Sequence, residues 1–202
     1  MRPNLFANTP DILHEFLQHG GRPAFRLRLL LAGTLSPLYG IYSGYELSEN
    51  VPVRPGSEEY LDSEKYEIRV RNYEAPSNLN GDIVLLNRIR REQTALQRAD
   101  NLTFVPSEND AILCYWKAGG GASAAASGGR DAHLLIAINL DPYHAHATMV
   151  HVPIAAMGIG ADESYTVHDL LTGARYTWRG SRNFVLLDPA QQPGHVLRVE
   201  RL

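Results

Sequence analysis

Leu79–Trp116 reads LNGDIVLLNRIRREQTALQRADNLTFVPSENDAILCYW, and within it the spacing of the apolar residues changes. In its first half, Ile83, Leu86 and Ile89 recur every three residues, which is the spacing of one face of an α-helix. In its second half, short runs rich in β-branched and aromatic residues alternate with turn-forming residues, as is typical of β-strands. The change predicts helical structure before residue 98 and β-structure after it.

On the N-terminal side, a helix is predicted over residues 9–19. Thr9 can cap its N-terminus, Pro10 fits its first position, and Asp11 falls in its first turn. The pair Gly20-Gly21 is expected to end this helix, because glycine readily adopts the left-handed backbone found at helix ends.

Further elements are predicted between this helix and the boundary. An apolar helix is expected over residues 23–35, a strand over 38–46 and a last helix over 79–97. Residues 48–77 form a long polar loop, and long loops in compact domains are often functional. The residues before Thr9 read as a strand entered in the middle of a fold.

The C-terminal half has the pattern of a β-sandwich, because several short strands are separated by turn signals. The stretch Ala118–Gly129, AGGGASAAASGG, is expected to be an elongated loop between two of these strands. The predicted strands are Leu102–Val105, Ala111–Trp116, His133–Asn139, Thr148–Val152, Tyr165–Asp169, Arg175–Trp178, Phe184–Leu187 and His195–Val199.

The predicted elements divide the chain into two domains, residues 1–97 and residues 98–202. The first holds about a quarter of a (β/α)8 barrel, a fold that needs roughly 250 residues. Two barrel strands alone would leave open edges and an uncovered core. Either the first domain adopts another fold, or the chain is a fragment.

Charge and composition argue against several kinds of binding partner and against a membrane location. The formal net charge is −3, which gives no electrostatic basis for binding nucleic acid or an anionic membrane. The N-terminus lacks the apolar region of a signal peptide, and no apolar run is long enough to span a bilayer. The single cysteine, Cys114, lies in an apolar run and is expected to be a buried thiol in a reducing cytoplasm.

Three motifs occur in an order that resembles the end of an α-amylase-family (glycoside hydrolase family 13) barrel. Asn8-Thr9-Pro10-Asp11 follows the leading strand, Gly44-Tyr45-Glu46 follows the second strand, and Leu86–Glu92, LNRIRRE, lies in the last helix. The family has a carboxylate-bearing motif after its seventh barrel strand, a Gly-x-Glu turn after its eighth, and a β-sandwich after its last helix. The resemblance implies an α/β region, the C-terminal portion of a (β/α)8 TIM barrel, followed by an all-β antiparallel sandwich.

Departures from the hydrolase pattern narrow this resemblance. Thr9-Pro10 stands where hydrolases have a single His, and Gly56–Glu67, GSEEYLDSEKYE, is similar to the bacterial α-1,4-glucan:maltose-1-phosphate maltosyltransferases. Members of that subfamily transfer maltosyl units from α-maltose-1-phosphate to the non-reducing ends of α-1,4-glucans, with retention and without a metal or organic cofactor. The complete enzymes form homodimers.

The resemblance assigns roles to three residues. Asp11 matches the family's transition-state stabiliser, and Lys65 and Tyr66 match its sugar-contacting pair. The nucleophile and the acid/base belong to the fourth and fifth barrel strands, which this chain lacks, so the chain alone is expected to be inactive. Spacing alone favours a first-turn acid, stabilised by the helix dipole, at Asp11, and a solvated charge run around Lys65; the resemblance reverses both interpretations.

Two other functions stay open. One is an α-amylase-type hydrolase or a trehalose synthase. The other is a non-catalytic glucan-binding module, for which Tyr115, Trp116, Tyr176 and Trp178 could stack on sugars, although aromatic residues on strands more often belong to a core.

Two further candidates are interpreted as structural. Glu46 is expected to be a hydrogen-bonded supporting residue. His144 and His146 are expected to lie in a solvated turn and not in a metal site.

Overall fold

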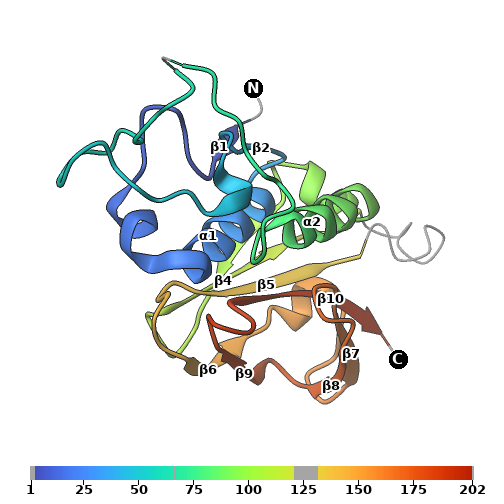
Figure 1. Cartoon of the computed structure of the whole chain (residues 1–202). Coiled ribbons are helices and arrows are strands. Elements are labelled where there is room, and N and C mark those ends of the chain that lie inside the picture. Colours follow the sequence, from blue (N-terminus) through green and yellow to red (C-terminus); the bar gives the residue numbers. More distant parts are fainter. Residues whose placement is uncertain (1–2, 66, 121–131, 202) are drawn as a thin grey trace.

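The computed structural model of the chain describes residues 3–65, 67–120 and 132–201. The helices come first along the chain, the antiparallel strands come last, and the two groups lie against each other (Figure 1). Tyr66 and most of the Ala118–Gly129 stretch lie outside the described residues. No helix in the described part combines the length and apolar character needed to cross a membrane.

The N-terminal part is built around a strand, a helix and a second, parallel strand. β1 and β2 pair in parallel, with Asn4 opposite Leu38 and Phe6 opposite Gly40. This strand–helix–strand order is the repeating unit of a (β/α)8 barrel. The elements are β1 (Asn4–Phe6), α1 (Glu15–Leu35), β2 (Leu38–Gly40), the 3-10 turn η1 (Tyr45–Leu47), α2 (Asn80–Glu92) and the 3-10 turn η2 (Thr94–Gln97).

The predicted helix start at Thr9 is wrong. Thr9 pairs with Ile12 in an isolated bridge, so Asp11 lies in a turn outside the helix. α1 begins at Glu15, where the His14 side chain accepts a hydrogen bond from Phe16 N at 3.1 Å. The capping residue is therefore a histidine that the propensity rules do not favour.

The predicted interruption at Gly20-Gly21 is confirmed. Gly21 has φ 56° and ψ −159°, which breaks the helical hydrogen-bond ladder inside α1. A residue with a Cβ is strained at this positive φ, so glycine suits the kink. The apolar half of α1 after the kink is largely buried, as its composition predicts.

Two element lengths differ from the prediction. The expected strand 38–46 ends at Gly40, because only Leu38–Gly40 has a partner strand in the described chain. The expected helix 79–97 is split at Gln93, whose backbone is extended, into α2 and η2.

The eight strands predicted after residue 98 are all confirmed to within two residues. Six of them form one sheet in the order β3-β4-β5-β10-β7-β8, and β6 pairs with β9 in a second sheet. Every pairing in both sheets is antiparallel. The elements are β3 (Leu102–Val105), β4 (Ile112–Lys117), β5 (Leu134–Asn139), β6 (His146–His151), the 3-10 turn η4 (Ile154–Met157), β7 (Ser164–Asp169), β8 (Arg175–Arg179), β9 (Arg182–Leu187) and β10 (Gly194–Arg201).

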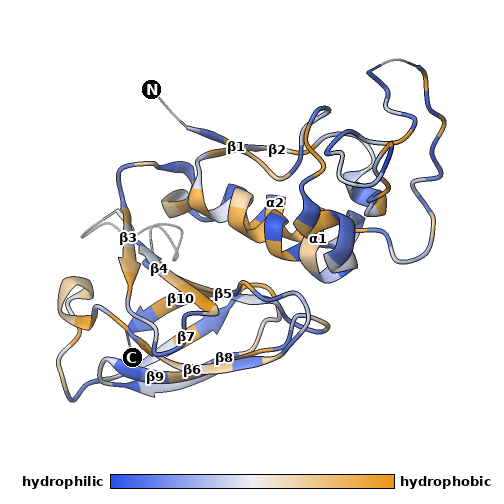
Figure 2. Cartoon of the chain, turned by 90° about the vertical axis from the view of Figure 1, so that its left-hand side faces the viewer, coloured by the Kyte–Doolittle hydropathy of each residue, from blue (hydrophilic) through white to orange (hydrophobic). Residues whose placement is uncertain are grey.

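The central strands of the six-stranded sheet are buried on both faces. Towards the helices, Tyr115, Ile136 and Val196 belong to the core that also contains the apolar side of α1. Towards the small sheet, side chains such as Leu135 and Val167 pack with residues of β6 and β9. Figure 2 shows apolar colouring along the strands between these layers and along the helices.

Arg90 of α2 holds the end of α1. Its guanidinium donates hydrogen bonds to the carbonyl oxygens of Gly33, Ser36 (3.1 Å) and Pro37 (2.7 Å). These carbonyls lie in the last turn of α1 or just beyond it, where no helical N–H is available to them. The same group lies 4.8 Å from the ring centroid of Tyr39. One side chain of the LNRIRRE motif therefore caps α1 and fixes the start of β2.

We predict that Arg90→Met lowers the free energy of unfolding by about 1.5–3 kcal/mol, because hydrogen bonds from a charged donor to partly buried carbonyls are lost. Urea denaturation followed by tryptophan fluorescence measures the change. Arg91→Met is the matched control, since Arg91 is the exposed neighbour on the same helix. Equal midpoints for the two variants would contradict the capping role.

Candidate functional site

The candidate site begins where β1 ends. Asn8 is buried and donates from Nδ2 to the Tyr60 hydroxyl at 2.7 Å, while its Oδ1 accepts from Tyr42 N at 2.8 Å. Burial raises the pKa of Tyr60 to about 12, so Tyr60 remains a neutral partner. Asn8 thereby joins the end of β1, the segment after β2 and the long loop.

Asp11 lies three residues further on, in the exposed Thr9–Ile12 turn. Ile12 N donates to Thr9 O at 3.2 Å, which closes the turn. Leu13 N then donates to Glu58 O at 2.5 Å, so that the chain after Asp11 is tied to the long loop. These bonds explain why the turn is not helical: its backbone groups have tertiary partners.

The long loop is folded back on itself before it reaches Lys65. Backbone bonds from Val53 N to Glu59 O and from Leu61 N to Val51 O form a small ribbon. Beyond it, Ser63 Oγ lies 3.3 Å from the Tyr42 hydroxyl and accepts from Lys65 N at 3.3 Å. The predicted polar loop is confirmed, and its order comes from these hydrogen bonds.

The structure brings Asp11 and Lys65 together. Lys65 Nζ donates to Asp11 Oδ1 and also lies 3.4 Å from Glu59 Oε1. The Asp11 side chain is 64% exposed and that of Lys65 is 31% exposed, so a ligand can reach both. Tyr66, the third predicted residue, lies outside the described residues.

Sequence reasoning missed an ionic network behind Lys65. Arg71 donates to Glu49 through Nε at 3.0 Å and through Nη2 at 3.2 Å, and its Nη1 lies 2.8 Å from Glu64 Oε1. Burial alone would lower the pKa of Arg71, but the two carboxylates outweigh burial and raise it. The close contact with the Arg71 guanidinium also lowers the pKa of Glu64. The one sequence signal was the alternation in Glu67–Arg71, EIRVR, inside a loop.

The Gly44-Tyr45-Glu46 turn packs against this network. Glu46 Oε2 accepts from Gly44 N at 3.1 Å, in agreement with the predicted supporting role. Gly44 has φ 94°, and a Cβ at this position would overlap the carboxylate of Glu49. Glycine is required here by backbone conformation and by space.

The remaining candidates are structural. Tyr115 is fully buried and Trp116 and Trp178 pack against the core, which leaves Tyr176, 44% exposed, as the one accessible member of the predicted aromatic set. Burial raises the pKa of Cys114 to about 12, so its thiol is inert.

His144 and His146 share one acceptor that the sequence analysis did not pair with them. Asp141 Oδ2 lies 2.8 Å from His144 Nδ1 and 3.0 Å from His146 Nε2. Within the described ranges, no group of three or more His, Cys, Asp or Glu side chains is placed to hold a metal ion.

Comparison with known proteins identifies the family. Residues 104–199 match the family model described as "GLGE, C-terminal". Over 205 residues the chain is 48% identical to the α-1,4-glucan:maltose-1-phosphate maltosyltransferase 2 of Streptomyces coelicolor and 46% identical to the maltosyltransferase of Corynebacterium glutamicum. The chain belongs to the maltosyltransferase family. It is covered completely by both matches and spans 29% of the length of each relative.

Solved structures with the fold of this maltosyltransferase-family chain include two α-amylases. The α-amylase of Geobacillus thermoleovorans, complexed with acarbose, has a TM-score of 0.66 at 13% identity, over 98% of this chain and 39% of its own. The Anoxybacillus α-amylase has a TM-score of 0.66 at 15% identity, over 96% of this chain and 38% of its own. The fold is thus the C-terminal portion of a (β/α)8 barrel followed by an antiparallel β-sandwich, and the alternative of an unrelated fold is excluded.

We predict that Gly44→Ala in this maltosyltransferase-family chain lowers the free energy of unfolding by more than about 1 kcal/mol, because Ala is strained at positive φ and would displace Glu49. Gly81→Ala is the control: a Cβ there meets no atom within 4 Å, and alanine favours helix α2 by up to about 1 kcal/mol. Urea midpoints of both variants check the prediction. A Gly44→Ala chain as stable as the Gly81→Ala chain would contradict it.

Proposed function

We propose that this chain is the C-terminal part of a retaining maltosyltransferase that moves maltosyl units from α-maltose-1-phosphate to the non-reducing ends of α-1,4-glucans and releases phosphate. The observation that carries the proposal is the contact between Asp11 and Lys65, which are 54 residues apart in sequence. They meet beyond the carboxyl ends of β1 and β2, the side of a barrel that carries active sites. The names of the relatives support the same activity.

In the proposed mechanism, Asp11 acts by its charge. The transition state of a retaining glycosyl transfer resembles an oxocarbenium ion, and a carboxylate held nearby stabilises its positive charge. Lys65 is proposed to donate hydrogen bonds to the sugar hydroxyls of the donor, and Tyr66 to pack on a sugar face. Glu59 adds a second acidic group at 3.4 Å from Lys65 Nζ.

Retention also needs a nucleophile and an acid/base about 5–5.5 Å apart. In the family these belong to the fourth and fifth barrel strands, and the described part of this chain has a single pair of parallel strands. We therefore propose that the 202-residue chain alone is inactive and works as part of a longer protein or assembly. No metal or organic cofactor takes part in the proposed reaction.

The finer assignments belong to the same proposal. We take residues 1–97 as the end of the catalytic barrel and residues 98–202 as the sandwich domain, in a complete protein that is a cytoplasmic homodimer without nucleic-acid or membrane partners. The inert, buried Cys114 suits a reducing compartment.

The experiment joins this chain in frame to the preceding part of the Streptomyces coelicolor maltosyltransferase 2, in place of the stretch that it matches. Phosphate release is measured with α-maltose-1-phosphate and glycogen. Phosphate release that depends on glycogen supports the proposal. A folded joined protein that hydrolyses glycogen and ignores maltose-1-phosphate would refute it in favour of a hydrolase.

In the joined enzyme, Asp11→Asn should lower kcat by about 10²–10³, the usual loss for a preorganised electrostatic group. Asparagine has nearly the same shape, so circular dichroism should show an unchanged fold. Glu58→Gln is the control, because Glu58 is an exposed acid of the long loop that lies against the Asp11 turn. If Asp11→Asn stays within about threefold of the wild type, far below the loss expected for such a group, Asp11 is only a turn residue.

Lys65→Ala should lower kcat/KM for α-maltose-1-phosphate, because a charged hydrogen-bond donor is removed. The loss should correspond to about 1.5–3 kcal/mol of transition-state stabilisation. Arg54→Ala, which removes an exposed cation from the same loop, serves as the reference. An unchanged kcat/KM for Lys65→Ala would remove the loop from the sugar site.

A further inference from the structure

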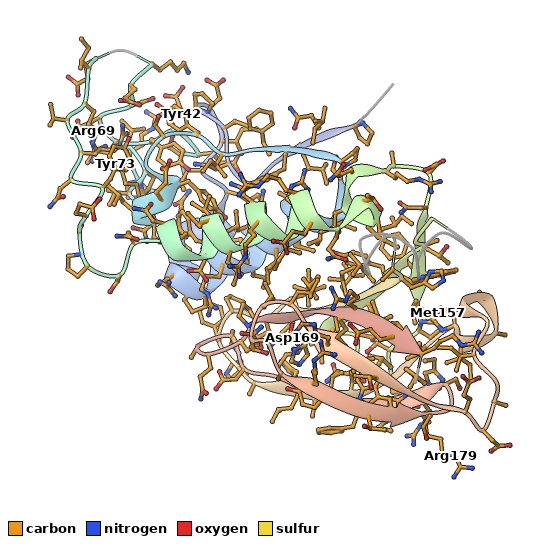
Figure 3. All side chains as sticks on the ribbon, turned by 90° about the vertical axis from the view of Figure 1, so that its right-hand side faces the viewer. Tyr42, Arg69, Tyr73, Met157, Asp169 and Arg179 are labelled. Carbon is orange, nitrogen blue, oxygen red and sulfur yellow. The ribbon has the colours of Figure 1, made fainter. Side chains whose placement is uncertain are left out.

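The segment that follows Lys65 has two chemically different sides. Ile68 and Val70 are 97% and 95% exposed, whereas Arg69 and Arg71 between and after them contact the protein. Arg69 donates to Leu61 O at 3.1 Å, and Figure 3 shows it at the loop end of the molecule near Tyr42 and Tyr73, far from Arg179. Two arginines therefore attach this part of the loop.

Arg71 makes the tighter attachment. Its side chain is 3% exposed, although it belongs to a loop, and its planar fork faces Glu49 through two nitrogen atoms. Arginine can make this two-pronged contact because its donors lie in one plane, and a point charge such as lysine cannot. A buried charge without a partner is costly. The Arg71 guanidinium avoids this cost because it lies between two carboxylates.

The two carboxylates that Arg71 contacts come from different segments of the chain. Glu49 is fixed to the turn after β2, where its N–H donates to Gly44 O at 3.1 Å and where the missing Cβ of Gly44 leaves space for its carboxylate. Glu64 is the residue immediately before Lys65. Arg71 thus links the fixed turn to the backbone of Lys65.

We propose that Arg71 is a positioning residue: by bridging Glu49 and Glu64 it holds Lys65 beside Asp11. The importance of Arg71 for sugar binding rests on the proposed function. The effect of Arg71 on the position of Lys65 is independent of that function. Ser63 is a weaker constraint, because its contacts with Tyr42 and with Lys65 N are both 3.3 Å long. Without Arg71, the loop keeps the contacts of Arg69 with Leu61 O (3.1 Å) and Glu49 (3.5 Å) but loses the ionic link to Glu64, the residue next to Lys65.

The first test measures the placement of Lys65 directly. The chain has two lysines, and Lys117 is fully buried. Acetylation of the folded 202-residue chain by a small reagent, followed by mass spectrometry of its peptides, therefore reports on Lys65 separately from the N-terminal amine. Arg71→Met should raise the Lys65 labelling rate about two- to fivefold, the change expected when a partly exposed ion pair is released. Arg54→Met, on the same loop, should leave the rate unchanged.

Glu64→Gln provides a second variant that keeps the side-chain shape. It should raise Lys65 labelling in the same direction as Arg71→Met, and it decides the question if Arg71→Met fails to fold. A folded variant of either kind with wild-type labelling of Lys65 overturns the positioning role.

The second test asks whether Arg71 acts through Lys65. In the joined enzyme, Arg71→Met should lower kcat/KM for α-maltose-1-phosphate by about tenfold or more, since a misplacement near 1 Å can cost up to about 100-fold. Added to Lys65→Ala, it should cause no further loss beyond about twofold, because residues that act through one contact are not additive. Additive losses would mean that Arg71 supports the fold in general and would overturn the proposal.

The two tests separate the two hypotheses. If Arg71→Met frees the Lys65 amine while Lys65→Ala leaves turnover unchanged, positioning by Arg71 is supported and the sugar-binding role of Lys65 is refuted. If neither labelling nor turnover responds to Arg71→Met, the positioning role is refuted on both counts.

Discussion

Burial of both faces at the centre of the six-stranded sheet is the constraint on which the rest of the structure depends. Its central strand β5 is apolar at five successive positions, Leu134–Ile138, and no residue of it is exposed. A strand of this kind needs apolar partners on two sides. The helices cover one face of the sheet and the small β6–β9 sheet covers the other. The helices of the barrel part are therefore packed directly on a sheet of the sandwich.

The loop that carries the candidate site is held by a different kind of interaction. Apart from the buried Tyr60, it lies beyond the cores, and its position comes from backbone bonds to the Asp11 turn and from the charges around Arg71. Polar attachments of this kind are directional, which suits a site that must hold an amine and a carboxylate at a set separation. The same region leaves Ile68 and Val70 almost fully exposed.

Exposed apolar surface also occurs at β1 and β2. Leu5, Phe6 and Leu38 are 39–47% exposed, and both strands have a free edge in the described structure. Sheet edges of this kind are paired in a closed barrel. Since the chain spans 29% of the length of its maltosyltransferase relatives, the proposed complete enzyme provides a physical reason for this surface.

The sequence by itself determined the strands, the kink at Gly21 and the family, because apolar spacing, glycine conformation and short motifs are local properties. It also pointed to Asp11 and Lys65, through resemblance and not through spacing. It placed Asp11 wrongly in a helix, since propensity rules ignore the tertiary bond from Leu13 N to Glu58 O. Only the tertiary structure decided that Lys65 meets Asp11 and that Arg71 bridges Glu49 and Glu64, because the partner of a charge is set by the path of the whole chain.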